Sequence, residues 1–187
     1  ERLMEQLIEQ EFSEESLQGL KGHLAMGHVR YSTTGASSVI NAQPFTAVHQ
    51  GSTLAVAHNG NLVNIRTLRD ELEKQGSIFQ STMDSEVVVH LLARHAHLGL
   101  EGAIAETFKQ IKGAFSLLLM TPDKLIAVRD PHGFRPLCLG KINGGAYIVA
   151  SETCALDLVE AQYIRDIEPG EVLIVDMDGI KSIPPPA

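Results

Sequence analysis

The fold class is decided by the stretch Phe115-Ser116-Leu117-Leu118-Leu119-Met120, which is almost continuously apolar. A short run of this kind is typical of a strand covered on both faces, because a half-exposed strand would alternate apolar and polar residues. The turn residues Thr121-Pro122-Asp123 follow it and lead into a second apolar run at residues 125–128. We therefore expect two strands joined by a tight turn, the first of them fully buried.

The rest of the carboxyl-terminal half carries further strand signals. Asn143-Gly144-Gly145 separates residues 137–141 from residues 146–150, which is a strong hairpin signal. Further expected elements are a short helix at residues 153–159, strands at 163–167 and 171–176, and a last tight turn at Asp178-Gly179.

The amino-terminal half has mostly helical spacing. In residues 64–75, Ile65, Leu68 and Leu72 share one face, with Asn64 as candidate cap and Gly76 as stop. Further helices are expected at residues 2–10, 14–20, 82–97 and 102–112, strands at 23–30 and 53–58, and a long loop at 31–52. Because strand–helix–strand units do not repeat, this order favours the α+β class with antiparallel sheet over a doubly wound fold.

The composition suits a globular domain. The chain has 187 residues, 44% of them hydrophobic, and a formal net charge of -8. Without a basic stripe to neutralise phosphates, no nucleic-acid partner is expected. No apolar run approaches the length of a membrane-spanning helix, and the amino end lacks the sections of a secretory signal. Only Cys138 and Cys154 are present, so no disulfide scaffold is expected and the cytoplasm is the default location.

Common catalytic motifs are absent from the sequence. It has no Gly-rich phosphate loop, no dinucleotide-binding fingerprint and no paired-histidine zinc helix. The eight histidines do not fall into ligand spacing, and His90 and His97 are too far apart on their helix to chelate one ion. We therefore expect no metal site, and three polar clusters become the candidates for chemistry.

The first cluster is Gly27-His28-Val29-Arg30-Tyr31-Ser32-Thr33-Thr34-Gly35. An arginine at a strand end, followed by a flexible loop, can clamp a substrate carboxylate with two hydrogen bonds. The alternative is that Arg30 pairs with a structural acid.

The second cluster is His58-Asn59-Gly60-Asn61. A side-chain amide beside a glycine N–H offers two neutral donors that could converge on one developing oxyanion. Asn-Gly is also the commonest hairpin turn dipeptide, so a plain turn is the alternative.

The third cluster is Ser81-Thr82-Met83-Asp84-Ser85-Glu86, at the start of a helix. Asp84 could hold a substrate ammonium group, but Ser81 and Asp84 also have capping-box-like spacing. A carboxylate clamp, an oxyanion hole and an ammonium binder together describe a pocket for a free amino acid with a reactive side-chain carbonyl.

These clusters resemble those of the class II glutamine amidotransferases. The likeness lies in residues 28–35, Asn41-Ala42-Gln43-Pro44-Phe45, residues 58–62 and Asp84-Ser85-Glu86-Val87. Three segments resemble more narrowly the amidophosphoribosyltransferases of purine synthesis: Arg129-Asp130-Pro131-His132-Gly133-Phe134-Arg135-Pro136-Leu137, residues 151–157 and residues 166–171. The likeness covers nearly the whole chain in the right order.

The resemblance implies a role for each cluster. Arg30 would bind the α-carboxylate of glutamine and Asp84 its α-amino group, while Asn59 and the Gly60 amide would form the oxyanion hole. The segment that closes over bound glutamine would begin with Tyr31, Ser32, Thr33, Thr34 and Gly35. A separate charged turn with Arg129, Asp130, His132 and Arg135 is expected to be held by its own ion pairs and to have a structural or interdomain role.

The resemblance also implies a fold and a domain organisation. The fold would be the four-layer αββα sandwich of the N-terminal nucleophile hydrolases, incomplete at its amino end. Residues 1–182 would form the glutaminase domain. Residues 183–187, which include Pro184-Pro185-Pro186, would begin a linker to a phosphoribosyltransferase domain that is absent here.

The sequence departs from the family at the nucleophile, which in the family is a cysteine at the mature amino terminus. Glu1 is not that residue. Cys138 is expected in the core of a strand, and Cys154 stands where the family has no catalytic group. We therefore expect this chain alone to be inactive.

The implied function is that of a transferase, in which glutamine hydrolysis supplies ammonia for phosphoribosylamine formation in the first step of de novo purine synthesis. The expected partners are glutamine, the phosphoribosyltransferase domain and further copies of the enzyme in a homo-oligomer. No cofactor is expected in this chain, magnesium would bind the absent domain, and an iron–sulfur cluster is left open. The alternatives are a glutamine-binding or scaffolding module without a nucleophile and the glutaminase domain of a hexosamine-synthesising amidotransferase.

Overall fold

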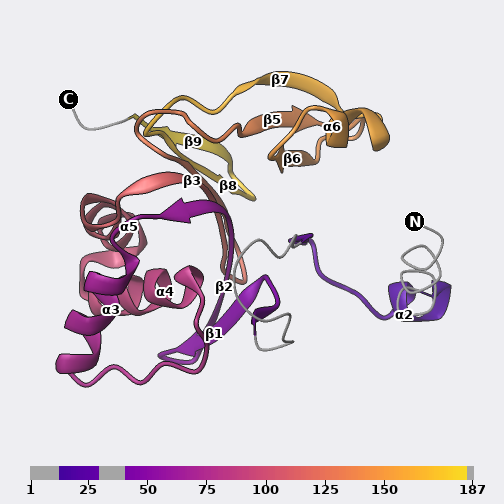
Figure 1. Ribbon diagram of the computed structural model, residues 1–187. Helices are drawn as coiled ribbons and strands as arrows, with labels where there is room; N and C mark the ends of the chain where they lie inside the picture. Colours follow the sequence, from indigo (N-terminus) through magenta and orange to yellow (C-terminus); the bar gives the residue numbers. More distant parts are fainter. Residues whose placement is uncertain (1–12, 30–40, 185–187) are drawn as a thin grey trace.

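The computed structural model describes residues 13–29 and 41–184, whose strands form two antiparallel sheets (Figure 1). The larger sheet has the strand order β1-β2-β3-β4-β8-β9 and the smaller one β6-β5-β7. Every strand pair in this part of the chain is antiparallel, which confirms the predicted α+β class.

The described helices are α2 (Glu14–Gln18), α3 (Ile65–Lys74), α4 (Asp84–Arg94), α5 (Gly99–Gln110) and α6 (Cys154–Leu158), with a 3₁₀ turn η2 (Ala96–Leu98). The strands are β1 (Phe45–His49), β2 (Ser52–Leu62), β3 (Gly113–Met120), β4 (Leu125–Arg129), β5 (Cys138–Lys141), β6 (Tyr147–Ala150), β7 (Gln162–Asp166), β8 (Val172–Asp176) and β9 (Gly179–Ile183). The helix expected at residues 2–10 lies outside the described residues.

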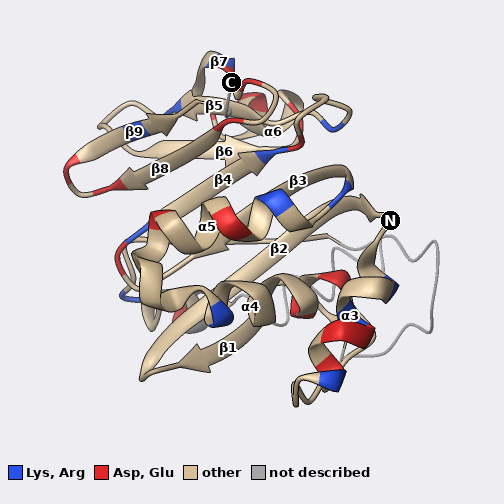
Figure 2. Ribbon diagram, turned by 90° about the vertical axis from the view of Figure 1, so that its left-hand side faces the viewer, with Lys and Arg blue, Asp and Glu red and all other residues tan. Residues whose placement is uncertain are grey.

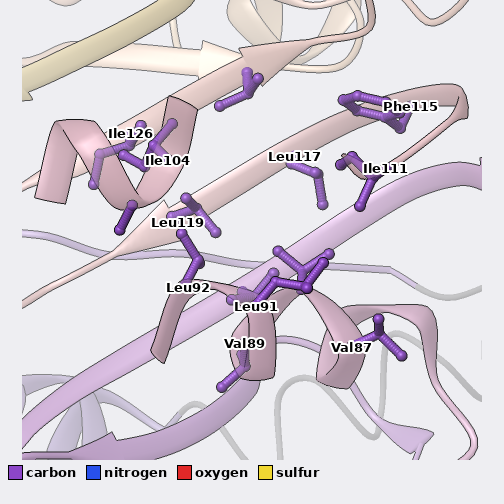
Figure 3. Packing of buried hydrophobic residues seen from close by; sticks show 14 of the residues in the cluster. Val87, Val89, Leu91, Leu92, Ile104, Ile111, Phe115, Leu117, Leu119 and Ile126 are labelled. Atoms are coloured by element: carbon purple, nitrogen blue, oxygen red, sulfur yellow. The ribbon is translucent and has the colours of Figure 1, made fainter. Parts of the chain in front are cut away.

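The larger sheet separates two hydrophobic cores. Leu117 and Leu119 of β3 pack against α4 and α5 (Figure 3). Leu118, which lies between them in the sequence, belongs to the core on the opposite face. This alternation explains the continuous apolar run of β3, because both of its faces are covered as the sequence predicts.

The second core lies between the two sheets. Ala127 and Leu173 of the larger sheet meet Leu139 of the smaller one. On the other face of the smaller sheet, a Cβ at Gly140 would lie 2.8 Å from the side chain of Leu156 in α6. The layers therefore run helix, sheet, sheet and helix, and in the described part of the chain α6 stands for the fourth layer.

The Asn59-Gly60 pair does not end a strand, so the prediction that the strand breaks there is wrong. Asn59 pairs with Ser116 and Gly60 with Phe115 of β3, inside the ladder that continues to Leu62. Gly60 has φ 140, and a Cβ there would lie 2.1 Å from the Ala114 carbonyl oxygen. The glycine therefore permits a close approach of two strands, and the hairpin-turn alternative is excluded.

Two predictions near the amino end are also wrong. The expected loop at 31–52 contains β1, which turns into β2 through Gln50 (φ 51) and Gly51 (φ 79). Positive φ at both central residues is what a type I′ two-residue hairpin turn needs, although Gln-Gly is a weak sequence signal for it. The described residues of the expected strand at 23–30 form no strand, because they have no ladder partner within the described chain.

The predicted helices shift at their ends. α4 begins at Asp84 and stops at Arg94, and α5 begins at Gly99, earlier than expected. Asn64 holds the N-cap position of α3 without a capping bond, since its side chain bonds the Gln110 carbonyl (2.7 Å) and the Lys112 N–H (2.9 Å). The last strand, β9, runs to Ile183, one residue into the segment expected to be linker.

The helical layer covers one face of the larger sheet (Figure 2). The helices of this layer carry several charged residues, whereas β3 has no charged residue. Within the described residues, no helix combines the length and the apolarity needed to cross a bilayer.

Candidate functional site

A cleft with a volume of about 1140 Å³ opens where the end of β2, the start of α4 and the smaller sheet approach one another. Residues 27–29, Arg135 of the charged turn and Ser116 of β3 also line it. Segments far apart in the sequence thus face one space.

The three described candidate residues, Asn59, Gly60 and Asp84, all line this cleft. The N–H of Leu62 donates to Asp84 Oδ2 at 3.4 Å, which links the end of β2 to the start of α4. Arg30 and the closing-loop residues Tyr31, Ser32, Thr33, Thr34 and Gly35 lie outside the described residues, although Val29, the neighbour of Arg30, lines the cleft.

Asp84 does not act as part of a capping box with Ser81. The N-cap of α4 is Met83, which makes no side-chain capping bond, and the Ser81 hydroxyl instead accepts the Met83 N–H at 3.2 Å. Asp84 forms no salt bridge within the described residues. Burial raises the pKa of its carboxyl, against the opposing effects of the Leu62 N–H and the Arg69 charge. A ligand cation would stabilise the charged form of such a group.

Asn59 offers a free side-chain amide. Its backbone is held in the β2–β3 ladder opposite Ser116, whose hydroxyl donates to the Pro136 carbonyl at 2.9 Å. The Asn59 side chain is exposed at the cleft and makes no hydrogen bond to another described residue. Its donor is therefore available to a bound molecule.

His58 also lines the cleft; it belongs to the second polar cluster, but the sequence pattern assigns it no role. It is 7% exposed, and its backbone N–H donates to Gln43 Oε1 at 2.6 Å. Burial, followed by the charges of His28 and Arg135, lowers the pKa of His58 to about 4, so the ring is neutral at pH 7. Its Nε2 is buried without a hydrogen-bond partner in the described chain. The signal that could have found its role is a histidine within a buried strand, directly before Asn-Gly.

The charged turn at residues 129–135 is a structural unit. Asp130 is fully buried and accepts the N–H groups of His132, Phe134 and Arg135. Arg129 donates to the carbonyls of Gly133, Arg135 and Ile167. The turn is therefore held by bonds from side chains to backbone, and the prediction that ion pairs hold it is wrong.

Neither cysteine lines the cleft. Cys138 is 3% exposed within β5, as expected, and burial raises the pKa of its thiol. Cys154 is exposed at the start of α6. Among the described residues, no group of three or more His, Cys, Asp and Glu side chains could hold a metal ion.

Comparison with known proteins identifies the class to which this fold and cleft belong. A family model described as a glutamine amidotransferase domain matches residues 28–158, which include Asn59, Gly60, Asp84 and most of the cleft lining. The chain belongs to this glutamine amidotransferase domain family.

Several similar proteins within that class are amidophosphoribosyltransferases. Amidophosphoribosyltransferase 1, chloroplastic, of Arabidopsis thaliana is 52% identical over 176 residues, which cover 94% of this chain and 31% of that protein. A solved structure described as the allosteric regulatory enzyme of purine biosynthesis is 46% identical, with a TM-score of 0.79 over 83% of this chain and 34% of the other. The glutamine phosphoribosylpyrophosphate amidotransferase of Bacillus subtilis, complexed with ADP and GMP, is 47% identical, with a TM-score of 0.77 over 83% of this chain and 33% of the other.

These findings confirm the resemblance drawn from the sequence, and the two solved structures support the predicted sandwich fold. The chain spans about a third of the length of the relatives that it matches.

Proposed function

We propose that this chain is the glutamine-hydrolysing part of an amidophosphoribosyltransferase and that it supplies ammonia for phosphoribosylamine formation in the first step of purine synthesis. The observation that carries the proposal is the lining of one cleft by Asn59, Gly60 and Asp84. Two neutral donors and an acid match the side-chain carbonyl and the ammonium group of one amino acid.

The cleft residues divide the work of binding and catalysis. Asp84 holds the glutamine ammonium group, and Arg30 holds the α-carboxylate. A cysteine thiolate, which the family resemblance expects at the mature amino terminus, attacks the side-chain amide carbon. The Asn59 amide and the Gly60 N–H stabilise the resulting oxyanion. As it collapses, the carbon–nitrogen bond breaks and the nitrogen takes up the proton that the cysteine thiol gave up, so that it leaves as ammonia. Water then cleaves the glutamyl thioester to glutamate and regenerates the thiol.

The remaining parts of the proposal concern the complete enzyme. The ammonia passes to a phosphoribosyltransferase domain, which holds phosphoribosyl pyrophosphate with magnesium. Tyr31 to Gly35 close over bound glutamine, and the enzyme works as a homo-oligomer. The proposed location is the cytoplasm, although similar plant proteins are named as chloroplastic.

The direct test uses the full-length protein and measures two products. Glutamine with phosphoribosyl pyrophosphate should yield glutamate and phosphoribosylamine, and added ammonia should replace glutamine. Amination of a hexose phosphate instead would favour a hexosamine-synthesising enzyme. Glutamine binding without any release of ammonia would favour a scaffolding module.

A further inference from the structure

Glu86 is a buried acid in the first turn of α4, two residues after Asp84, and it is 2% exposed. Its Oε1 accepts the Gln80 N–H at 2.6 Å. Its Oε2 accepts both the Ser81 N–H at 2.7 Å and the Ser81 hydroxyl at 2.6 Å. Since that hydroxyl in turn accepts the Met83 N–H, one carboxylate organises the segment at residues 80–83 that leads into Asp84.

Arg69 of α3 also binds the segment at residues 80–83. Its guanidinium donates to the Ser81 carbonyl at 2.8 Å and lies 4.0 Å from Glu86 Oε2. It also stacks over the Phe79 ring, 3.9 Å from the ring centroid, and Phe79 packs on His90. The segment is therefore held by a charge-assisted network with few ways to shift.

This network is more than a helix start requires. A single side-chain oxygen suffices to cap a helix, whereas a buried carboxylate needs several donors to offset its desolvation. The network fixes the segment whose last residues, Thr82 and Met83, line the cleft beside Asp84.

We propose that Glu86 is a positioning residue for glutamine: together with Arg69 it fixes residues 80–83 and so sets the place of the Asp84 carboxylate at the substrate ammonium group. The inference rests on the proposed function and deepens it. Glu86 itself does not touch the substrate.

The test is Glu86→Gln in the full-length enzyme. The amide keeps the size of the side chain but turns one acceptor into a donor, which then opposes a backbone N–H. The KM for glutamine should rise on the order of tenfold, because a charge-assisted contact to the substrate is loosened. The kcat should change less, and synthesis from added ammonia should stay at the wild-type rate.

The matched control is Glu73→Gln. Glu73 is the other acid beside Arg69, at 3.9 Å, but its side chain is half exposed and does not bond residues 80–83. This variant should leave the KM for glutamine unchanged. Combined with Asp84→Asn, Glu86→Gln should add little to the effect of Asp84→Asn alone, because both act on the same contact.

The outcomes separate this inference from the proposed function. An unchanged KM in Glu86→Gln, an equal loss of ammonia-dependent synthesis, or full additivity with Asp84→Asn would overturn the positioning role. Wild-type enzyme that releases no ammonia from glutamine would overturn the proposed function and this inference together. If Glu86→Gln fails to fold, Ser81→Ala removes the hydroxyl that connects Glu86 to the Met83 N–H, and it should raise the same KM.

Discussion

Asn59 has its backbone fixed in the β2–β3 ladder, while its side chain remains free at the cleft. In the complete enzyme, Asn59→Ala should lower glutamine-dependent turnover by roughly 10²–10³-fold, the usual effect of losing one oxyanion donor. Glutamine binding should change much less, since the donor strengthens as charge develops in the transition state. Steady-state kinetics with glutamine and with free ammonia measures both effects.

The comparison variant is Arg30→Ala, which should mainly raise the glutamine requirement because it removes a contact already made in the ground state. Ammonia-dependent synthesis should survive in both variants. If Asn59→Ala abolished synthesis from ammonia as well as from glutamine, Asn59 would be a folding element and its assignment to the oxyanion hole would be wrong.

His58 makes stability depend on pH. Its pKa of about 4 in the folded chain lies below the ordinary 6.5, so between these values the unfolded chain binds a proton that the folded chain does not. The stabilisation is complete above pH 6.5 and is lost as the pH falls toward 4, by about 3 kcal/mol in total. Urea unfolding at pH 7.5 and at pH 4.5 should show this loss in the wild type.

In His58→Gln the difference between the two pH values should be smaller, while the exposed His23→Gln should behave like the wild type. An equal difference in all three proteins would show that His58 does not carry the effect.

The Glu171 carboxyl titrates at a lower pH than His58. Burial alone would raise its pKa, but Arg165, Ser182 and the Glu168 N–H together lower it to about 2.

Part of the candidate site could be predicted from the residue types in the sequence. Asn59 and Asp84 stand in short polar clusters at the ends of apolar runs, so their placement at one cleft could be anticipated. The positioning role of Glu86 could not be predicted from the sequence, because its partners are backbone N–H groups whose positions depend on the loop conformation. The lowered pKa of His58 depends on burial and on charges brought near by folding.

At the scale of the element, β2 and β3 approach each other too closely for side chains at two glycines. A Cβ at Gly113 would lie 2.2 Å from the Asn61 carbonyl oxygen, at a φ of 145. Gly113→Ala should therefore destabilise the chain by about 3 kcal/mol, through backbone strain and steric overlap. Thermal or urea unfolding measures the loss.

Gly22→Ala is the matched control, because its added Cβ would meet only the Leu24 carbonyl oxygen at an ordinary 3.4 Å. Its stability should stay within about 0.5 kcal/mol of the wild type. Equal stability of Gly113→Ala and Gly22→Ala would contradict the close approach of β2 and β3.

Elements with strong local patterns were predictable, and those defined by a partner were not. The apolar run of β3 and the Asn143-Gly144-Gly145 hairpin are both confirmed. β1 was missed because it is short, its exposed face mixes Thr46 with the apolar Val48, and its turn, Gln50-Gly51, is a weak hairpin signal. The continuation of β2 through Asn59-Gly60 was missed because the local turn preference is overridden by pairing with β3.

At the scale of the whole molecule, the cleft has candidate oxyanion donors, but no cysteine of this chain lines it in the described structure. The isolated chain of 187 residues should therefore release no ammonia from glutamine at a rate comparable with the full-length enzyme. Coupled detection of ammonia measures this. Comparable turnover by the isolated chain would redirect attention to the exposed Cys154.

From the residue pattern, only the α+β class could be predicted, and not the way in which the two sheets stack. The sequence indicates that strands are buried, but which strands form the smaller sheet depends on long-range pairs such as Cys138 with Asp166. Those pairs bring Ala150 and Ser151 to the same cleft as Asp84. The site is therefore a product of the assembled sandwich and not of any single segment.

The most direct measurement is a crystal structure of the full-length enzyme with glutamate, the product of the proposed hydrolysis. We expect one glutamate in the cleft, with its ammonium group at Asp84 and its side-chain carboxylate between the Asn59 amide and the Gly60 N–H. Glutamate bound elsewhere, or bound in this cleft with its ammonium group away from Asp84, would contradict it.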